Sequence, residues 1–207
     1  MKFKLLIVIL GAMLIAVYGA LAVLIVGFSG DAPPENTPTS GSGTGEGPLT
    51  AREAYALAVS KAQNWREDAQ LVNATASWAN VASEEQLAAD AAWGFTFVSG
   101  QSAEMEILSV TRLGAERVRE MRSPSSLRTA DIGSWQVDSP EVVSLFLEHG
   151  GRDFLSQHPG ATISLRLGPE EASSRLVWLA IGIQSADKST MVLEVDASTG
   201  EVLNDTS

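Results

Sequence analysis

A run of 24 residues, Leu5 to Phe28, contains no charged side chain and separates the start of this chain from the rest. As a helix rising about 1.5 Å per residue, the run extends roughly 36 Å, which is enough to cross a bilayer with some tilt. Lys2 and Lys4 precede the run, and acidic residues follow it. Because Lys and Arg favour the cytoplasmic side of a span, the sequence predicts a single-pass anchor, residues 1–28, with a cytoplasmic N-terminus and an extracytoplasmic C-terminal part.

The same run can be interpreted as a cleaved signal peptide, because two segments place small residues at the spacing that signal peptidase prefers: 20–22 and 27–29. The apolar region of a signal peptide usually has about 7–15 residues, so we favour a retained anchor. Small residues also recur every four or eight positions in the run, which offers a stripe for homodimerisation. Single spans are often rich in Gly and Ala, so this stripe alone does not establish a dimer.

A flexible linker is predicted at residues 29–48, which contain Gly, Pro, Ser, Thr and a few acids but no large apolar side chain. Such a segment cannot bury apolar surface and should stay disordered. Treated as a flexible coil, the linker reaches roughly 25 Å, which is enough to hold a domain clear of the lipid headgroups.

Composition excludes several classes of function. The net charge of −11 repels nucleic-acid phosphates, so we expect no nucleic-acid partner. The chain has no cysteine, which removes disulfides, thiolate catalysis and thiol-bound metals. Only two histidines are present, and no cofactor motif was found, so we expect no cofactor.

The residues after the linker predict a helix followed by strands. Thr50 and Glu53 have the spacing of a capping box, which starts a helix at residue 51. Apolar and polar residues then alternate at 72–78 and at 93–97, which is the two-residue period of half-buried strands. A turn near residue 100 leads into a third predicted strand that ends at residue 110.

A second series of the same kind follows. Asp138 and Pro140 predict a helix start, and the helix should stop at Gly150-Gly151. Further strands are predicted at 163–167, 177–183 and 191–195. Residues 111–137 would join the two series, with Trp135 and Val137 as candidates for one more strand.

These patterns predict an α+β fold, in which a transmembrane helix is followed by two tandem modules. Each module would consist of one helix packed on its own small antiparallel sheet. Module boundaries are predicted at 49–137, including the connector, and at 138–207. Similar spacings in the two series favour a duplication, and chance agreement of a few intervals is the alternative.

The segment Val195-Asp196-Ala197-Ser198-Thr199-Gly200-Glu201-Val202-Leu203 resembles the closing signature of PepSY domains, which are small extracytoplasmic modules. Leu49 to Ala54 resembles the start of such domains. The corresponding segment of the first series, residues 110–114, lacks the Asp and the Thr. The resemblance implies a helix on an antiparallel sheet, a place in the cell envelope, and a role in binding or restraining peptidases, and it brings no catalytic residues.

Asp196, Thr199 and Gly200 also have a structural interpretation that does not depend on a ligand. The carboxylate and the hydroxyl can accept hydrogen bonds from backbone N–H groups of a turn, and glycine tolerates the positive φ that such a turn requires. We therefore interpret the three residues as a structural turn.

An arginine-rich segment is the main candidate for contact with a protein partner. Arg112, Arg117, Arg119 and Arg122, followed by Arg128, give a local positive charge on an otherwise acidic chain. Such a segment could meet an acidic partner or anionic headgroups. The alternative is a charged edge strand that prevents sheet-to-sheet aggregation.

Three other patterns suggest chemistry, each with a simpler explanation. Ser185 and Lys188 match the Ser-x-x-Lys pattern of acyl-serine enzymes, but they fall between predicted strands and lack the companion motifs. The only cluster of metal-capable residue types fits no familiar zinc spacing: Glu148, His149, Asp153 and His158. The acidic pairs at 84–85 and 170–171 point apart on a helix or strand and are interpreted as solubilising charges.

The sequence therefore predicts a membrane-anchored extracytoplasmic protein that acts as a non-enzymatic binding or regulatory module. The expected partner is another envelope protein, with a peptidase as one candidate. A Ser–Lys hydrolase and a purely structural envelope spacer are the alternatives.

Overall fold

The computed structural model describes residues 47–124, 127–170, 173 and 175–206. The predicted anchor at 5–28 and nearly all of the predicted linker lie outside these residues. Within the described part of the chain, no helix combines the length and the apolar character that crossing a membrane requires.

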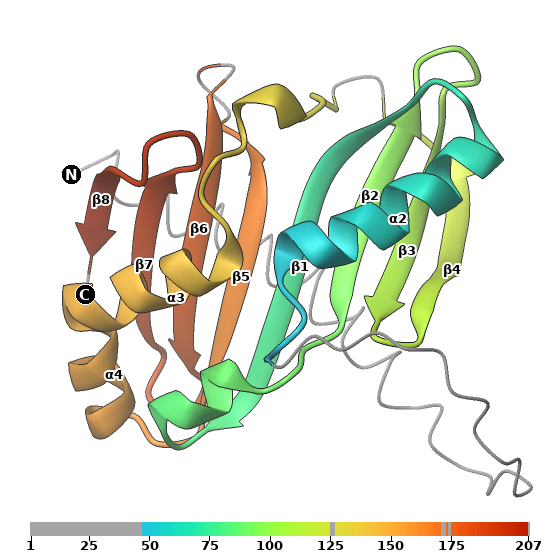
Figure 1. Ribbon diagram of the computed structural model, residues 1–207. Helices are drawn as coiled ribbons and strands as arrows, with labels where there is room; N and C mark the ends of the chain where they lie inside the picture. The colour runs from blue at the N-terminus through green and yellow to red at the C-terminus, as the bar shows by residue number, and fades with distance from the viewer. Residues whose placement is uncertain (1–46, 125–126, 171–172, 174, 207) are drawn as a thin grey trace, which may run out of the picture. The chain divides into compact units, whose positions relative to one another are not determined.

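Two series of elements follow each other, and each has helical segments followed by four strands (Figure 1). The first series consists of α2 (Ala51–Trp65), β1 (Ala69–Val81), a 3-10 helix (Glu84–Ala88), β2 (Trp93–Ser99), β3 (Glu104–Thr111) and β4 (Gly114–Arg122). The second consists of a 3-10 helix (Ile132–Ser134), α3 (Ser139–Phe146), a kinked segment (Leu147–Gly151), α4 (Arg152–Gln157), β5 (Ala161–Pro169), β6 (Leu176–Gln184), β7 (Ser189–Asp196) and β8 (Val202–Thr206).

All eight strands belong to one antiparallel sheet, in the order β4-β3-β2-β1-β5-β6-β7-β8. The prediction of two tandem modules, each with its own small antiparallel sheet, is therefore wrong. The two series join where β1 pairs with β5, for example at Ala76 with Leu165 and at Trp78 with Ile163. A long strand such as β1 would otherwise leave a row of backbone N–H and C=O groups without partners, and pairing with β5 satisfies them.

The connector predicted at 111–137 agrees with expectation in part, because the charged edge strand offered as the alternative for the arginine-rich segment is present. Its first part forms β4, an edge strand that pairs with β3 along its whole length. Trp135 and Val137, which are both described, do not form the extra strand that was proposed for them. They follow a short 3-10 helix, Ile132–Ser134. The N–H groups of Gln136 and Val137 both donate to the carbonyl oxygen of Ala197, so this stretch is tied to the end of β7.

Helix α2 begins as the sequence predicts. The Thr50 hydroxyl accepts from the backbone N–H of Glu53, and the Glu53 carboxylate accepts from the N–H of Thr50, so the predicted capping box is confirmed. The helix packs on β1 to β4 through small residues, which let it lie close to the sheet. The buried residues of this helix face are Ala51, Ala54, Ala58 and Ala62.

The second helix does not stop at Gly150-Gly151 as predicted. Helix α3 ends at Phe146, the chain kinks at Gly150 with φ +107°, and α4 continues to Gln157. A Cβ atom on Gly151 would lie 2.5 Å from the carbonyl oxygen of Phe146, so only glycine fits at that position. The glycines therefore redirect the helix instead of ending it.

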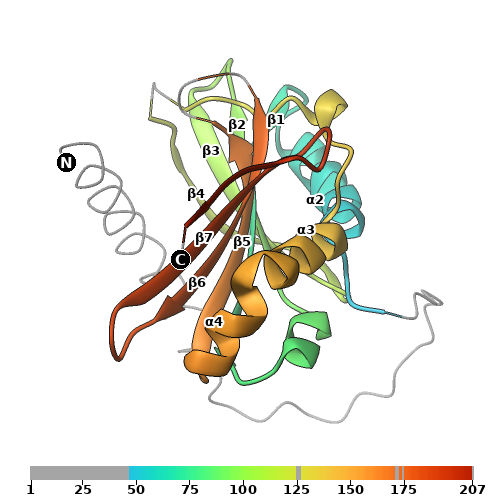
Figure 2. The ribbon, with the colours of Figure 1, turned by 90° about the vertical axis from the view of Figure 1, so that its left-hand side faces the viewer.

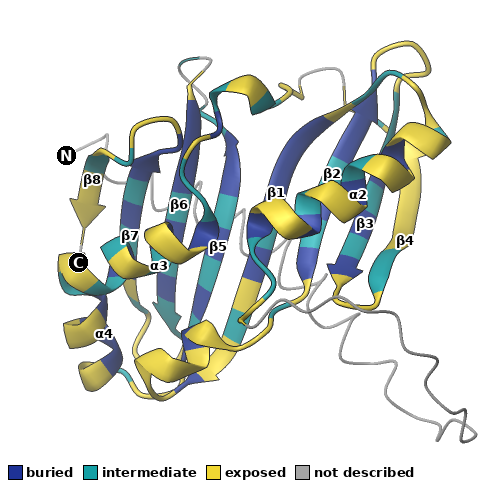
Figure 3. Ribbon diagram, viewed as in Figure 1, coloured by how far each residue is buried: buried dark blue, intermediate teal, exposed yellow. Residues whose placement is uncertain are grey.

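The core lies between the helices and one face of the sheet (Figure 3). Four aromatic rings from both series meet near its centre, with centroid distances of 5.7 to 6.3 Å: Tyr55, Trp93, Trp135 and Trp178. Trp135 and Trp178 both donate their indole N–H to the carbonyl oxygen of Val137. The two series thus share a single hydrophobic core.

Candidate binding surface

Helices α2, α3 and α4 all lie on the same side of the sheet (Figure 2). Along β5, Ile163, Leu165 and Leu167 face the helices and are buried, whereas the residues between them point to the opposite face and are partly exposed. No described helix covers this opposite face, which we call the open face. Its partly exposed side chains include Thr75, Ser77, Thr96, Ile107, Thr162, Ser164, Arg166, Leu179, Ile181, Ile183, Val192 and Glu194.

The strand register sets which of these side chains are neighbours. Thr75 on β1 pairs with Arg166 on β5, Arg166 pairs with Leu179 on β6, and Leu179 pairs with Glu194 on β7. Directly paired residues of antiparallel strands share a face and have Cβ atoms about 5 Å apart. One row across the open face therefore runs from a hydroxyl through a cation and an aliphatic side chain to a carboxylate.

Beside this row, β1 and β5 carry hydroxyl groups, whereas β6 carries aliphatic side chains. Ser77 and Ser164 are paired, and their hydroxyl oxygens lie 2.8 Å apart in a hydrogen bond. On β6, Ile181 and Ile183 continue the aliphatic strip that begins at Leu179. The centre of the open face is polar on the β1–β5 side and apolar on the β6 side.

Arg166 lacks the partners that other arginines of the chain have. Its Nε–H donor is buried and has no acceptor, and none of the hydrogen bonds or ion pairs among the described residues involves its side chain. By contrast, Arg66 contacts Glu104 at 2.7 Å and Arg152 contacts Glu84 at 3.0 Å. A buried N–H donor without an acceptor costs free energy, so such groups are uncommon in folded proteins.

Glu194, at the other end of the row, has a raised pKa. Burial disfavours its charged form, and the nearby carboxylate of Glu170 adds to the effect, whereas Arg175 opposes it. The folded state therefore holds the proton of Glu194 more tightly than the unfolded chain does.

This shift predicts a pH-dependent gain in stability for Glu194→Gln. A raised folded-state pKa contributes stability below the ordinary value of 4.5, and that contribution is lost as the pH rises through the folded value. At neutral pH the substitution should therefore raise the thermal midpoint slightly, and at about pH 3.5 this gain should disappear. Calorimetry at the two pH values measures this difference. Glu116→Gln on β4 is the control, and an equal gain at both pH values for Glu194→Gln would contradict the prediction.

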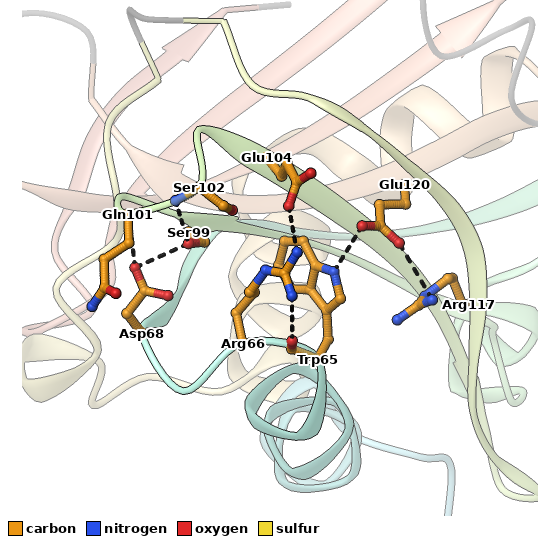
Figure 4. Close-up of polar contacts among 9 residues, drawn as sticks. All are labelled: Trp65, Arg66, Asp68, Ser99, Gln101, Ser102, Glu104, Arg117 and Glu120. Carbon is orange, nitrogen blue, oxygen red and sulfur yellow. Dashed lines mark hydrogen bonds and ion pairs between the residues drawn. The ribbon is translucent and has the colours of Figure 1, made fainter.

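A second polar cluster lies where the end of α2 meets β3 and β4 (Figure 4). Arg117 donates through Nε to Oε1 of Glu106, whose side chain is fully buried. The other carboxylate oxygen of Glu106 has no hydrogen-bond partner. Glu120 accepts from the indole N–H of Trp65 at 3.1 Å and lies 3.4 Å from Arg117. The exposed edge strand β4 therefore contacts α2 through Glu120 and Trp65, and it contacts the buried carboxylate of Glu106 through Arg117.

Beside this cluster lies a cavity of about 350 Å³. Asp68 accepts from the hydroxyl of Ser99 and from the N–H of Gln101, both at 3.0 Å. The hydrogen bonds from Gln101 and Ser99 lower the pKa of Asp68. Since this carboxylate is already satisfied within the chain, it fixes the β2–β3 hairpin. The remaining lining residues are Arg66, Glu67 and Ser102.

A shallow groove of about 400 Å³ lies between the start of α2, α3 and the 3-10 helix at Glu84–Ala88. Its apolar lining includes Trp78, Leu87, Val143 and Leu147. The indole N–H of Trp78 donates to the carbonyl oxygen of Ala89 at 3.1 Å. Glu84 and Glu85 also line the groove.

The structure does not gather the predicted arginines into one patch. Arg117 and Arg122 pair with Leu108 and Glu104 on the helix side of β3, whereas Arg119 pairs with Ile107 on the open face. Arg112 lies at the other end of β3, where it contacts Asp90 at 2.6 Å. Arg128 donates to the carbonyl oxygen of Ser173. These arginines are close in sequence but do not form one surface patch.

The residues of the predicted structural turn lie together between β7 and β8. Asp196 accepts from the N–H groups of Ser198 and Thr199, and Gly200 has φ +79°. The hydrogen bond from the Ser198 hydroxyl is the main reason why the pKa of Asp196 is lowered. The Thr199 hydroxyl accepts from the N–H of Glu201.

The other candidate residues lie in loops and helix ends. Ser185 and Lys188 lie in the turn between β6 and β7, where Lys188 has φ +62°. His149 lies 3.6 Å from Asp205, and His158 lies 3.1 Å from Asp187. Within the described ranges, no three His, Cys, Asp or Glu side chains gather as metal ligands would.

Comparison with known proteins identifies no family. No family model and no curated protein matches the sequence. Among solved structures, the chain is similar to a crystal structure described as a "putative lipoprotein" from Clostridium difficile 630, with 12% identity and a TM-score of 0.49. The match covers 74% of this chain and 91% of the other. At this identity and score, the similarity supports no statement about function.

Proposed function

We propose that this protein is a membrane-anchored, extracytoplasmic binding module that docks one envelope protein on the open face. The anchor rests on the uncharged run at 5–28 and on Lys2 and Lys4 before it. The resemblance of residues 195–203 to PepSY domains supports a place in the envelope and makes a peptidase the first candidate partner.

One observation supports this proposal above the others. The described helices cover one face of an eight-stranded sheet, and the other face carries an aliphatic strip next to a polar centre. Contiguous apolar side chains with polar neighbours on an uncovered face mark a candidate protein-contact surface. Neither cavity described above opens between open-face side chains, which favours a macromolecular partner over a small ligand.

The hydrolase alternative has little support from the same geometry. Ser185 and Lys188 do not share a helix face, since both lie in a hairpin turn. No hydrogen bond joins their side chains among the described contacts, so we do not pursue this alternative.

Site-specific photocrosslinking tests the docking face. A photoreactive phenylalanine analogue at Ile181, on the open face, should give one protein adduct of defined size in native membranes, identified by mass spectrometry. The same analogue at Leu57, which is 41% exposed on α2, is the matched control and should give none. If the adduct is a peptidase, the purified full chain should lower its activity. Equal adducts from both positions, or none from Ile181, would contradict the proposal.

A further inference from the structure

We propose that Arg166 is the recognition residue of the open face and binds a carboxylate presented by an extended segment of the partner protein. This inference rests on the proposed function, since it names the chemistry by which the open face selects its partner. The observation behind it is a cation at the centre of the face that no described group neutralises.

The environment of Arg166 fits a carboxylate. A guanidinium offers two parallel N–H donors that match the two oxygens of a carboxylate, and such paired hydrogen bonds are strong and directional. Thr75 pairs directly with Arg166, and Ser164 lies two positions away on the same face of β5. The Thr75 hydroxyl donates to the carbonyl oxygen of Gly94, and the Ser164 hydroxyl shares a hydrogen bond with Ser77. Both hydroxyl groups therefore have partners within the chain and leave the guanidinium as the donor for the anion. The terminal Nη groups of Arg166 would meet this carboxylate, because its Nε atom has almost no accessible surface.

The neighbouring side chains argue for a singly charged group on an apolar segment. Leu179 and Ile181 adjoin Arg166 on the β6 side, so the carboxylate must come with apolar side chains next to it. Glu194 lies beyond Leu179 in the same row, and the whole chain carries a net charge of −11. A phosphate or an anionic membrane would meet this negative field, whereas one carboxylate can be balanced by Arg166 alone.

Arg166 should also reduce stability in the free protein. The buried Nε donor of Arg166 has no acceptor, so removing the guanidinium should stabilise the free protein. Arg166→Met retains the aliphatic stem and removes the guanidinium. The thermal midpoint of this variant should rise by about 2 °C. A lower midpoint would show that the guanidinium supports the fold, which contradicts a recognition role.

Peptide selection tests the inference directly. The probe is a displayed library of random twelve-residue peptides, selected on the full chain in phosphatidylcholine nanodiscs and depleted on empty nanodiscs. We expect enriched peptides that carry Asp or Glu beside apolar residues. Changing that acid to its amide should weaken binding about tenfold or more, and Arg166→Met should weaken the acidic peptide equally. Arg166→Met should not further weaken the amide peptide, because the two changes remove the same contact.

Two variants distinguish failure of this inference from failure of the proposed function. If Ile181→Asn abolishes peptide binding but Arg166→Met leaves it unchanged, the open face binds partners without Arg166 and the inference is wrong. If neither variant changes binding, or no peptide is enriched, both proposals fail. If Arg166→Met instead abolishes binding to phosphatidylserine vesicles and leaves peptide binding intact, Arg166 recognises a lipid headgroup and the inference is overturned.

Discussion

Replacing Trp178 with alanine should lower the free energy of unfolding by about 4 kcal/mol, because the substitution leaves a large cavity in a closed core. The Trp178 side chain is fully buried and contacts Trp93 of the first series and Trp135 of the connector. Its indole N–H also holds the carbonyl oxygen of Val137 at 2.9 Å. For a domain of about 160 residues, this loss should lower the thermal midpoint by about 10 °C, measured by circular dichroism.

Trp65→Ala is the matched control for Trp178→Ala. Trp65 lies at the end of α2, is partly exposed and donates to Glu120, so its loss should cost only about 1–2 kcal/mol. Because the two series share one core, Trp178→Ala should destabilise both in a single transition. Hydrogen exchange should accelerate in β2 as much as in β6. Acceleration confined to β5 to β8 would show that the two series unfold independently.

Arg117→Ala should destabilise the protein by about 3 kcal/mol, because it leaves the buried carboxylate of Glu106 without its cationic partner. We expect a value at the lower end of the range for such pairs, since Arg117 is 44% exposed and its removal admits water to the carboxylate. Urea unfolding followed by tryptophan fluorescence measures the effect.

Arg119→Ala is the control for this prediction, since Arg119 is an exposed neighbour on the same strand, and its substitution should change stability by less than about 0.5 kcal/mol. A second test replaces the pair together. Glu106→Leu with Arg117→Leu should restore stability to near the wild-type value, because a buried ion pair is often no better than apolar side chains of similar volume. Equal effects of Arg117→Ala and Arg119→Ala would refute the importance of the pair.

Local elements of the fold could be predicted from the sequence, whereas their assembly could not. The capping box at Thr50 and the strand alternation around Trp93 depend on neighbouring residues, so a short window of sequence reveals them. Pairing of β1 with β5 depends on residues more than 80 positions apart. The residue pattern of β1 does not specify which strand pairs with its second edge. The sequence offers strand β4 only as one alternative, a charged edge strand, because its residues are almost all polar or exposed and give no apolar alternation.

The candidate site shows the same division. The arginines at 112–122 are close in sequence, but a register shift in the β3–β4 pairing places Arg117 and Arg119 on opposite faces of the sheet. Arg166 was visible as a polar position in an alternating strand. Its lack of a partner, however, depends on which strands flank β5, which the sequence does not reveal.

The junction of β1 with β5 also affects how the chain acquires its structure. β1 meets β2 across a short connection, whereas Trp78 must wait for Ile163 to be synthesised before the two can pair. Closing so long a loop costs entropy before any contact compensates, so a high contact order should make folding slow, on the order of milliseconds to seconds. Until β5 has been synthesised, one edge of β1 stays open to other chains, so the half-synthesised protein should be prone to aggregation.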